Sequence, residues 1–299
     1  MAEPAITDEG MRRGQVEANG LAFSYIEAGE GPLALCLHGF PDCADGWQPL
    51  LSSLGAAGFH AVAPYMRGYA PTAVPTDGRF QSGVLVADAN ALHEALDGDE
   101  RAVIIGHDWG AFAAYGAPRT APARWSKAVV ASVPPATLAM PLLLSYDLLK
   151  SNFWYQFVLC NPLADLAVPM NDLEFIERLW SDWSPGYDAT AAVATVKRSL
   201  RDPANLSAAL AYYRHTLGGA HSDPALADEQ GASMQVPDIA TLYLHGEDDG
   251  CFPAPARETL AAAFTAPGSR VELLADAGHF LQYEQSGQVA EVIVEFLGS

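Results

Sequence analysis

Short runs of apolar residues recur along the first half of the chain and again near its end. Leu33–Leu37 is almost continuously apolar, which is typical of a strand in a sheet that is covered on both faces. Strand character recurs at Phe23–Ala28, Phe59–Pro64, Ala102–Ile105, Lys127–Val133, Thr241–Leu244 and Val271–Leu274. Helical patterns are expected among them at Gly83–Leu96, Ala256–Phe264 and Gln288–Leu297. This alternation predicts an α/β fold in which helices flank a mostly parallel central sheet.

The pattern changes between about residues 135 and 236. Aromatic-rich helical segments occur there without clear strands, at Leu148–Leu159, Leu173–Trp183 and Asn205–Leu217. We therefore expect a helical cap at 136–236 inserted into a core formed by 1–135 and 237–299.

Composition narrows the class of ligand. Of the 299 residues, 50% are hydrophobic and 17% are charged, enough apolar material for a large buried core. The formal net charge of -20 would repel nucleic acid and anionic membrane lipids. A neutral small molecule is the expected partner.

The four cysteines, Cys36, Cys43, Cys160 and Cys251, form no C-x-x-C pair, so buried free thiols are expected in place of a zinc motif or disulfide framework. The chain has neither a signal-peptide pattern at its start nor an apolar run of about 20 residues. These features predict a cytoplasmic protein, and no motif in the chain calls for a metal or an organic cofactor. They leave the oligomeric state open, including a homo-oligomer.

A sharp strand-to-helix turn is predicted where Val103–Ile105 leads into Gly106-His107-Asp108-Trp109-Gly110. This is the G-x-nucleophile-x-G pattern, in which glycines on both sides let the backbone turn tightly. A helix N-terminus behind Asp108 would favour its ionised carboxylate. A carboxylate nucleophile displaces a leaving group from carbon and forms an ester with the enzyme. An ordinary helix cap is the structural alternative for this pentapeptide.

Hydrolysis of such an ester needs a base. Ala277-Gly278-His279-Phe280 follows the last predicted strand, which makes His279 the candidate base. The strand Thr241–Leu244 ends in His245-Gly246-Glu247-Asp248-Asp249. Asp249 fits the spacing of an orienting carboxylate best, Asp248 is the alternative and Glu247 fits less well. His38, His107 and His245 are expected to bond loop backbone.

An oxyanion hole is expected beside the nucleophile. The loop His38-Gly39-Phe40-Pro41 follows the strand Leu33–Leu37. When a nucleophile lies on a sharp strand-to-helix turn, a loop in this position supplies one backbone N–H of the oxyanion hole, and the residue after the nucleophile supplies the other. Phe40 and Trp109 are therefore the candidate donors, and both are also expected near the substrate.

These motifs, with Arg67-Gly68-Tyr69, resemble those of the epoxide hydrolases, the aspartate-nucleophile branch of the α/β-hydrolase superfamily, over nearly the whole chain. The resemblance implies an α/β-hydrolase fold with a cap, and two cap tyrosines that bind and protonate the epoxide oxygen. Tyr155, in Phe153-Trp154-Tyr155-Gln156, matches the first. Tyr213 before Arg214 matches the second, and its neighbour Tyr212 is a rival. Core packing is the alternative role for either ring.

The resemblance implies that a small apolar epoxide is opened to a vicinal diol through a hydroxyalkyl ester on Asp108. Water activated by His279 and Asp249 then hydrolyses this ester.

A haloalkane dehalogenase is the alternative enzyme, because it would use the same triad. Phe40 departs from the asparagine that often donates to the halide there, and Trp109 and Phe112 depart from the arginines of fluoroacetate dehalogenases. A carboxylester hydrolase fits poorly, since an aspartate attacking an acyl group gives an anhydride. A non-enzymatic binding protein is the alternative from another class.

Overall fold

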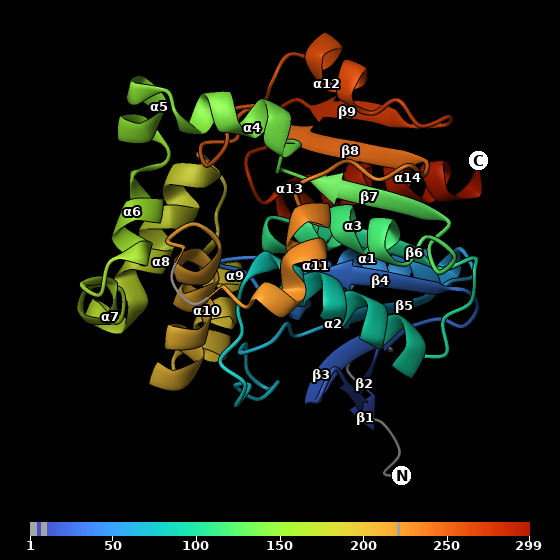
Figure 1. Ribbon diagram of the computed structural model, residues 1–299, viewed down its shortest axis with the longest axis horizontal. Helices are drawn as coiled ribbons and strands as arrows, with labels where there is room; N and C mark the ends of the chain where they lie inside the picture. The colour runs from blue at the N-terminus through green and yellow to red at the C-terminus, as the bar shows by residue number, and fades with distance from the viewer. Residues whose placement is uncertain (1–4, 7–10, 220–221) are drawn as a thin grey trace.

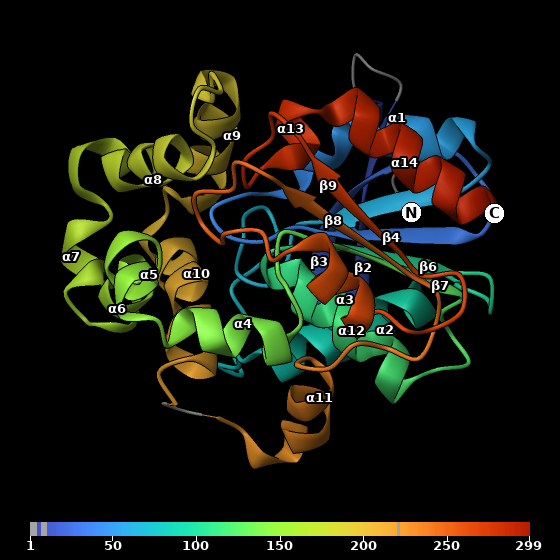
Figure 2. The same ribbon diagram turned by 90° about the horizontal axis from the view of Figure 1, so that it is seen from above.

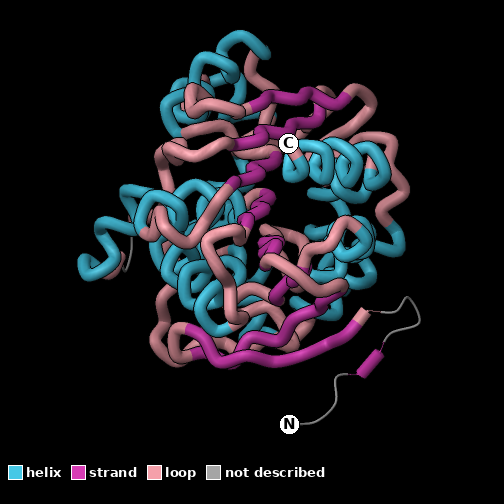
Figure 3. The backbone as a smooth tube through the Cα atoms, turned by 90° about the vertical axis from the view of Figure 1, so that its right-hand side faces the viewer, coloured by secondary structure: helices cyan, strands magenta, loops and turns pink. Residues whose placement is uncertain are grey.

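A twisted nine-stranded sheet forms the centre of the protein, with helices on both of its faces (Figure 3). The computed structural model describes residues 5–6, 11–219 and 222–299. The strand order is β1-β2-β3-β5-β4-β6-β7-β8-β9. The strands are β1 (Ala5–Ile6), β2 (Arg12–Ala18), β3 (Leu21–Ala28), β4 (Leu33–Leu37), β5 (His60–Pro64), β6 (Val103–His107), β7 (Lys127–Ala131), β8 (Thr241–Gly246) and β9 (Arg270–Leu274).

The sheet is antiparallel at its N-terminal edge and parallel elsewhere. Strands β1, β2, β3 and β5 pair antiparallel in that order. Strands β5, β4, β6, β7, β8 and β9 pair parallel. Strand β4 is buried at all five positions, as its continuous apolar run predicts for a sheet covered on both faces. The expected fold class is confirmed.

Two groups of helices cover the sheet (Figure 2). One face carries α1 (Gln48–Ala56), α13 (Leu281–Glu284) and α14 (Ser286–Gly298), of which α1 and α14 pack together. The other carries α2 (Ser82–Ala95) and α3 (Trp109–Thr120), which pack against each other. Helix α12 (Arg257–Ala263) packs on β9, and a short 3₁₀ helix, η1 (Ala44–Trp47), precedes α1.

The chain between β7 and β8 is helical and extends to one side of the sheet (Figure 1). Its helices are α4 (Ala136–Leu143), α5 (Tyr146–Ser151), α6 (Trp154–Cys160), α7 (Ala164–Ala167), α8 (Met170–Trp183), α9 (Thr190–Leu200) and α10 (Pro203–Thr216). The single helix expected at Leu148–Leu159 is wrong, because α5 ends and α6 begins within it. Asn152, at the break, donates its side-chain amide to the carbonyl of Gly250 at 2.8 Å.

The last part of this insertion returns to the core. The 3₁₀ helix η2 (Pro224–Leu226) leads into α11 (Ala227–Ala232), which packs against the core helices α2 and α3. The predicted division into core and cap at residue 236 remains a prediction about folding units. Among the described residues, no helix combines the length and apolar character needed to cross a membrane.

Candidate active site

Four candidate segments meet at one edge of the sheet, because parallel strands end on the same side. Strand β4 leads to Phe40, β6 leads to Asp108, β8 leads to Asp249 and β9 leads to His279. Asp108 lies at the N-terminal end of α3 with φ +50° and ψ -117°. This is an uncommon conformation for a residue with a β-carbon, and it is the strained turn that the sequence predicts.

The glycines on either side of Asp108 are required by close approach. A β-carbon on Gly106 would lie 2.1 Å from the Gly110 carbonyl oxygen. A β-carbon on Gly110 would lie 2.1 Å from the Leu37 carbonyl oxygen. Neither space admits a side chain, so the pentapeptide can turn tightly only with glycine at both positions.

Asp108, Asp249 and His279 form a connected triad. The Nδ1 atom of His279 is 2.9 Å from Asp249 Oδ2, and its Nε2 atom is 3.7 Å from Asp108 Oδ2. Asp248 is exposed, so the structure favours Asp249 over that alternative. The imidazole therefore stands between the two carboxylates, with Nδ1 toward Asp249 and Nε2 toward Asp108.

Buried hydrogen bonds hold Asp249 and His279 in place. Asp249 Oδ1 accepts from the backbone N–H groups of Cys251 and Phe252, both at 2.8 Å. The carbonyl of His279 accepts from His107 Nε2 at 2.8 Å and from Ser132 Oγ at 2.9 Å. These contacts fix the two loops that carry the base and its partner.

Asp249 and His279 each shift the pKa of the other toward its charged form. Burial alone would raise the pKa of Asp249, but His279 and His245 hold that pKa well below its usual value. Burial alone would lower the pKa of His279, but the neighbouring Cys251 and Asp249 groups raise it above its usual value. An ionised Asp249 can therefore stabilise the imidazolium that forms when His279 takes a proton.

The expected histidine roles outside the triad are confirmed. His38 Nδ1 bonds the Gly39 carbonyl at 3.0 Å, and His245 Nε2 bonds the Phe252 carbonyl at 2.8 Å. His107 bonds the carbonyl of His279. The side chains of His38, His107 and His245 therefore all hydrogen-bond to backbone carbonyls of the loops around the triad.

One carboxylate oxygen of Asp108 contacts the loop that is expected to supply an oxyanion donor. The backbone N–H of Phe40 donates to Asp108 Oδ1 at 2.7 Å. A β-carbon on Gly39 would lie 2.1 Å from that oxygen and 2.6 Å from the backbone nitrogen of Trp109. Gly39 therefore lets the Phe40 loop approach the nucleophile closely.

The candidate residues open onto a mainly apolar cavity of about 330 Å³ between the sheet edge and the helices above it. Asp108, Trp109, Tyr155, Tyr213 and His279 all contribute to its wall. Phe40 does not, and its ring packs edge-on against Tyr213 at a centroid distance of 5.4 Å. The expected contact of Phe40 with substrate is thus corrected: the residue reaches the site through its backbone, because its side chain points into the packing.

The two expected cap tyrosines lie together in the wall, with ring centroids 5.9 Å apart. Within the described part of the chain, the buried Tyr213 hydroxyl has no hydrogen-bond partner, whereas the Tyr212 hydroxyl donates to the Arg67 carbonyl at 2.8 Å. Tyr213 is therefore the tyrosine directed at the cavity. Burial raises the pKa values of Tyr155 and Tyr213 well above the usual value of a tyrosine, which keeps both phenols protonated.

Several wall residues were missed in the sequence because they come from separate elements. Phe112 lies on α3, Met140 and Leu143 lie on α4, and Leu217 follows α10. Cys251 also lines the cavity, two residues after Asp249. The four cysteines are free, as expected, and Cys160 alone among them is only half-buried. Only the spacing from Asp249 could have indicated Cys251.

Comparison with known proteins shows the family to which this chain belongs. The model of the alpha/beta hydrolase fold family matches residues 32–286, so this chain belongs to that family. It is 28% identical to Epoxide hydrolase A of Mycobacterium tuberculosis, over 94% of this chain and 96% of that protein. It is also 28% identical to an epoxide hydrolase of Caballeronia sordidicola, over 96% and 94% of the two chains. The crystal structure of Bacillus megaterium epoxide hydrolase with an inhibitor is similar, with a TM-score of 0.80, 25% identity and coverage of 96% of this chain and 100% of that one. The resemblance drawn from the motifs is confirmed.

Proposed function

We propose that this protein is an epoxide hydrolase that converts small apolar epoxides to vicinal diols. The observation that carries the proposal is the unpartnered, buried Tyr213 hydroxyl in the same apolar cavity as Asp108 and His279. An epoxide oxygen would supply the missing acceptor for that hydroxyl. The relatives named epoxide hydrolases support the same reaction.

In the first step, Tyr155 and Tyr213 donate hydrogen bonds to the epoxide oxygen while an oxygen of Asp108 attacks a ring carbon. The carbon–oxygen bond of the ring breaks as the new ester bond forms. The developing alkoxide takes a proton from a phenol, and such general acid catalysis contributes about 10²- to 10⁴-fold in rate. Asp108 Oδ2 is the attacking atom, since Phe40 N–H holds Oδ1.

In the second step, His279 removes a proton from water, which attacks the carbonyl carbon of the Asp108 ester. The oxyanion forms at the position of Oδ1, where Phe40 N–H donates, and the N–H of Trp109 is the second donor. One such donor contributes about 10²- to 10³-fold in rate. When the tetrahedral intermediate collapses, the ester bond breaks and the leaving alkoxide takes the proton held by His279. The proton left on the Asp108 carboxyl group returns, directly or through water, to the tyrosinate formed in the first step, so the diol leaves and the carboxylate and both phenols are restored.

A haloalkane dehalogenase is the second candidate, and one observation favours it. Trp109 lines the cavity, and its buried indole Nε1 has no hydrogen-bond partner among the described residues. It could donate to a halide. The cap tryptophan Trp180 cannot join it, since its Nε1 donates to the Pro41 carbonyl at 2.8 Å.

Parallel assays of the purified protein separate the two reactions. Panels of aryl and alkyl epoxides and of primary haloalkanes are scored for diol and halide release. The proposal predicts diol without halide. Halide release without diol formation would refute it and make Trp109 the leaving-group donor.

A further inference from the structure

Cys251 has no role in the proposed reaction, although it lies inside the active site. Its side chain is 2% exposed and lines the cavity. Its Sγ atom is 3.3 Å from the Tyr155 hydroxyl oxygen. Its backbone N–H bonds the carboxylate of Asp249, so the loop that carries the thiol is fixed to the triad.

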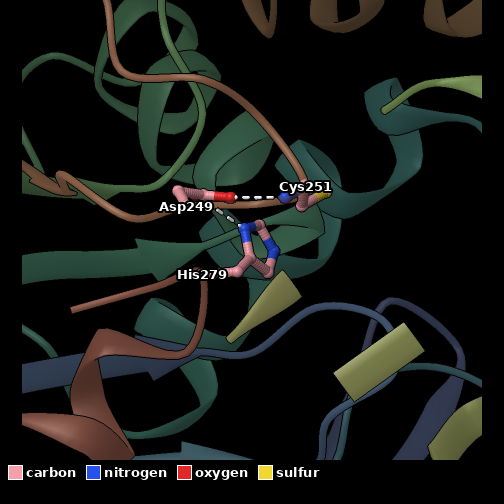
Figure 4. A group of neighbouring side chains, drawn as sticks. All are labelled: Asp249, Cys251 and His279. Atoms are coloured by element: carbon pink, nitrogen blue, oxygen red, sulfur yellow. Dashed lines mark hydrogen bonds and ion pairs between the residues drawn. The ribbon is translucent and has the colours of Figure 1, made fainter. Parts of the chain in front are cut away.

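Asp249, Cys251 and His279 bring three kinds of metal-binding atom together (Figure 4). One oxygen, the sulfur and one ring nitrogen all lie within 4.8 Å of one another. Zinc binds thiolate at about 2.3 Å and imidazole or carboxylate at about 2.0–2.2 Å, so its ligand atoms are about 3.3–3.7 Å apart. Side-chain shifts of about 1 Å would bring the three atoms to that spacing.

The surroundings favour a cation. A carboxylate oxygen of Asp249 lies within 4.8 Å of the thiol sulfur, and Asp108 lines the same cavity as Cys251. No lysine or arginine is among the described residues that line this cavity. The buried His279 Nε2 and Tyr213 hydroxyl, both in this wall, lack hydrogen-bond partners within the described residues. A metal ion would therefore find an unpartnered ring nitrogen on one of its own ligands, and its bound water would find the unpartnered Tyr213 hydroxyl in the same wall.

We propose that a divalent cation that binds thiolate, such as Zn²⁺, binds Asp249, Cys251 and His279 and switches the enzyme off. Binding replaces the thiol proton, which leaves to solvent, and occupies the imidazole that would activate water. The ion is an inhibitor, not a cofactor. The inhibition rests on the proposed function, whereas the binding site does not.

Direct binding is measured with Cd²⁺, whose bonds to thiolate absorb in the ultraviolet. The metal-stripped protein is titrated with Cd²⁺, and Zn²⁺ binding is measured by equilibrium dialysis. We expect one saturable site, with the absorption lost and Zn²⁺ affinity at least about tenfold lower in Cys251→Ser, since metal ligands contribute strongly to affinity. Cys160→Ser is the matched control, because Cys160 lies outside the group, and it should keep both signals.

A second measurement uses the unaltered protein and so does not depend on the folding of a variant. Zn²⁺ should protect Cys251 from alkylation by iodoacetamide, scored by peptide mass spectrometry, and leave the alkylation of Cys160 unchanged. Product formation should fall in step with occupancy of the site. Equal absorption in Cys251→Ser, or alkylation of Cys251 unaffected by Zn²⁺, would overturn the site. Full turnover at full occupancy would overturn the inhibition. A protein that binds Cd²⁺ through Cys251 yet acts on no epoxide would support the site and count against the proposed function.

Discussion

Tyr155 and Tyr213 differ in how their hydroxyl groups are bonded. Tyr155 bonds Cys251 Sγ at 3.3 Å and accepts from Gln156 Nε2 at 3.3 Å, whereas Tyr213 has no partner within the described residues. An unpartnered buried hydroxyl costs stability. Its presence is explained if the hydroxyl bonds a ligand, as the proposed function requires.

Replacing Tyr213 by Phe should separate function from stability. We expect kcat/KM for epoxides to fall about 10²-fold because an acid is lost, and the free energy of unfolding to stay the same or rise because no bond is broken. Steady-state kinetics and urea unfolding measure the two effects. The double change Tyr155→Phe with Tyr213→Phe should abolish diol formation.

Tyr212→Phe is the matched control for this prediction. It removes the bond to the Arg67 carbonyl and should lower stability by about 1 kcal/mol, with less than about a tenfold change in rate. A Tyr213→Phe enzyme as active as the parent would contradict the proposed role of this hydroxyl.

Sequence motifs located the triad because each member follows a recognisable strand. Asp108 and His279 could be placed by local pattern alone, whereas Asp249 was favoured by spacing with Asp248 left as the alternative. The choice between Tyr212 and Tyr213 could not be made in this way, since adjacent residues on a helix point in different directions and only the packed structure shows which one meets the cavity. Cys251 lies only two residues after Asp249, but the folded structure is needed to show that it lines the cavity.

At the scale of elements, the loop after β4 is tied to helix α13 by the buried carboxyl of Asp42. That group accepts from the Tyr283 hydroxyl at 2.6 Å, the Cys43 N–H at 2.7 Å and Gln282 Nε2 at 3.1 Å. Burial raises the pKa of Asp42 to about 7 despite these bonds. The loop that carries Phe40 is therefore held by a titratable contact.

Replacing Asp42 by Asn should stabilise the protein more at pH 8 than at pH 5. The folded pKa of Asp42, about 7, lies above the unfolded value of about 3.9. The folded state thus binds more protons between these values, and this group's contribution to stability is lost as pH rises through them. Gln282 Oε1, which lacks a partner among the described residues, can rotate to accept from the new amide.

Urea unfolding at the two pH values measures this difference. We expect the gain of the variant over the parent to be larger at pH 8 by about 1–3 kcal/mol, since each pKa unit corresponds to about 1.4 kcal/mol. A gain that is the same at both pH values would show that Asp42 does not titrate in this range.

Strands were predicted better than helices for a physical reason. Buried strands such as β4 are short apolar runs bounded by turn residues, a combination that indicates a strand in a sheet covered on both faces. The cap helices have aromatic residues on several sides, so their ends depend on contacts made elsewhere. The break between α5 and α6 follows Asn152, which bonds the Gly250 carbonyl, and no local pattern indicates that distant partner.

At the scale of the whole molecule, helix α8 connects the cap to the core at the catalytic loops. The ring of Trp180 stacks on Phe280 with centroids 3.5 Å apart, and its Nε1 donates to the Pro41 carbonyl. The Trp183 carbonyl accepts from His279 N–H at 3.0 Å and Gly250 N–H at 3.1 Å. The cap therefore positions the loops of both the base and its carboxylate partner.

Trp180→Phe should weaken this connection, because it keeps an aromatic ring for stacking but removes the indole N–H. The Pro41 carbonyl loses its donor, so we expect the free energy of unfolding to fall by about 1–3 kcal/mol. Trp154→Phe is the matched control, because Trp154 is 39% exposed and should change stability by less than about 0.5 kcal/mol. Equal losses in the two variants would contradict a special role for Trp180 in docking the cap.

The central claim, that Asp108 carries the covalent intermediate, is tested most directly by trapping the ester in His279→Gln. This variant keeps the nucleophile and the oxyanion donor but lacks the base, so mass spectrometry after brief exposure to an epoxide should find one added epoxide mass on the peptide that contains Asp108. Asp108→Asn should show no such adduct. Diol formation by His279→Gln at the parent's rate, or an adduct on another residue, would contradict the account.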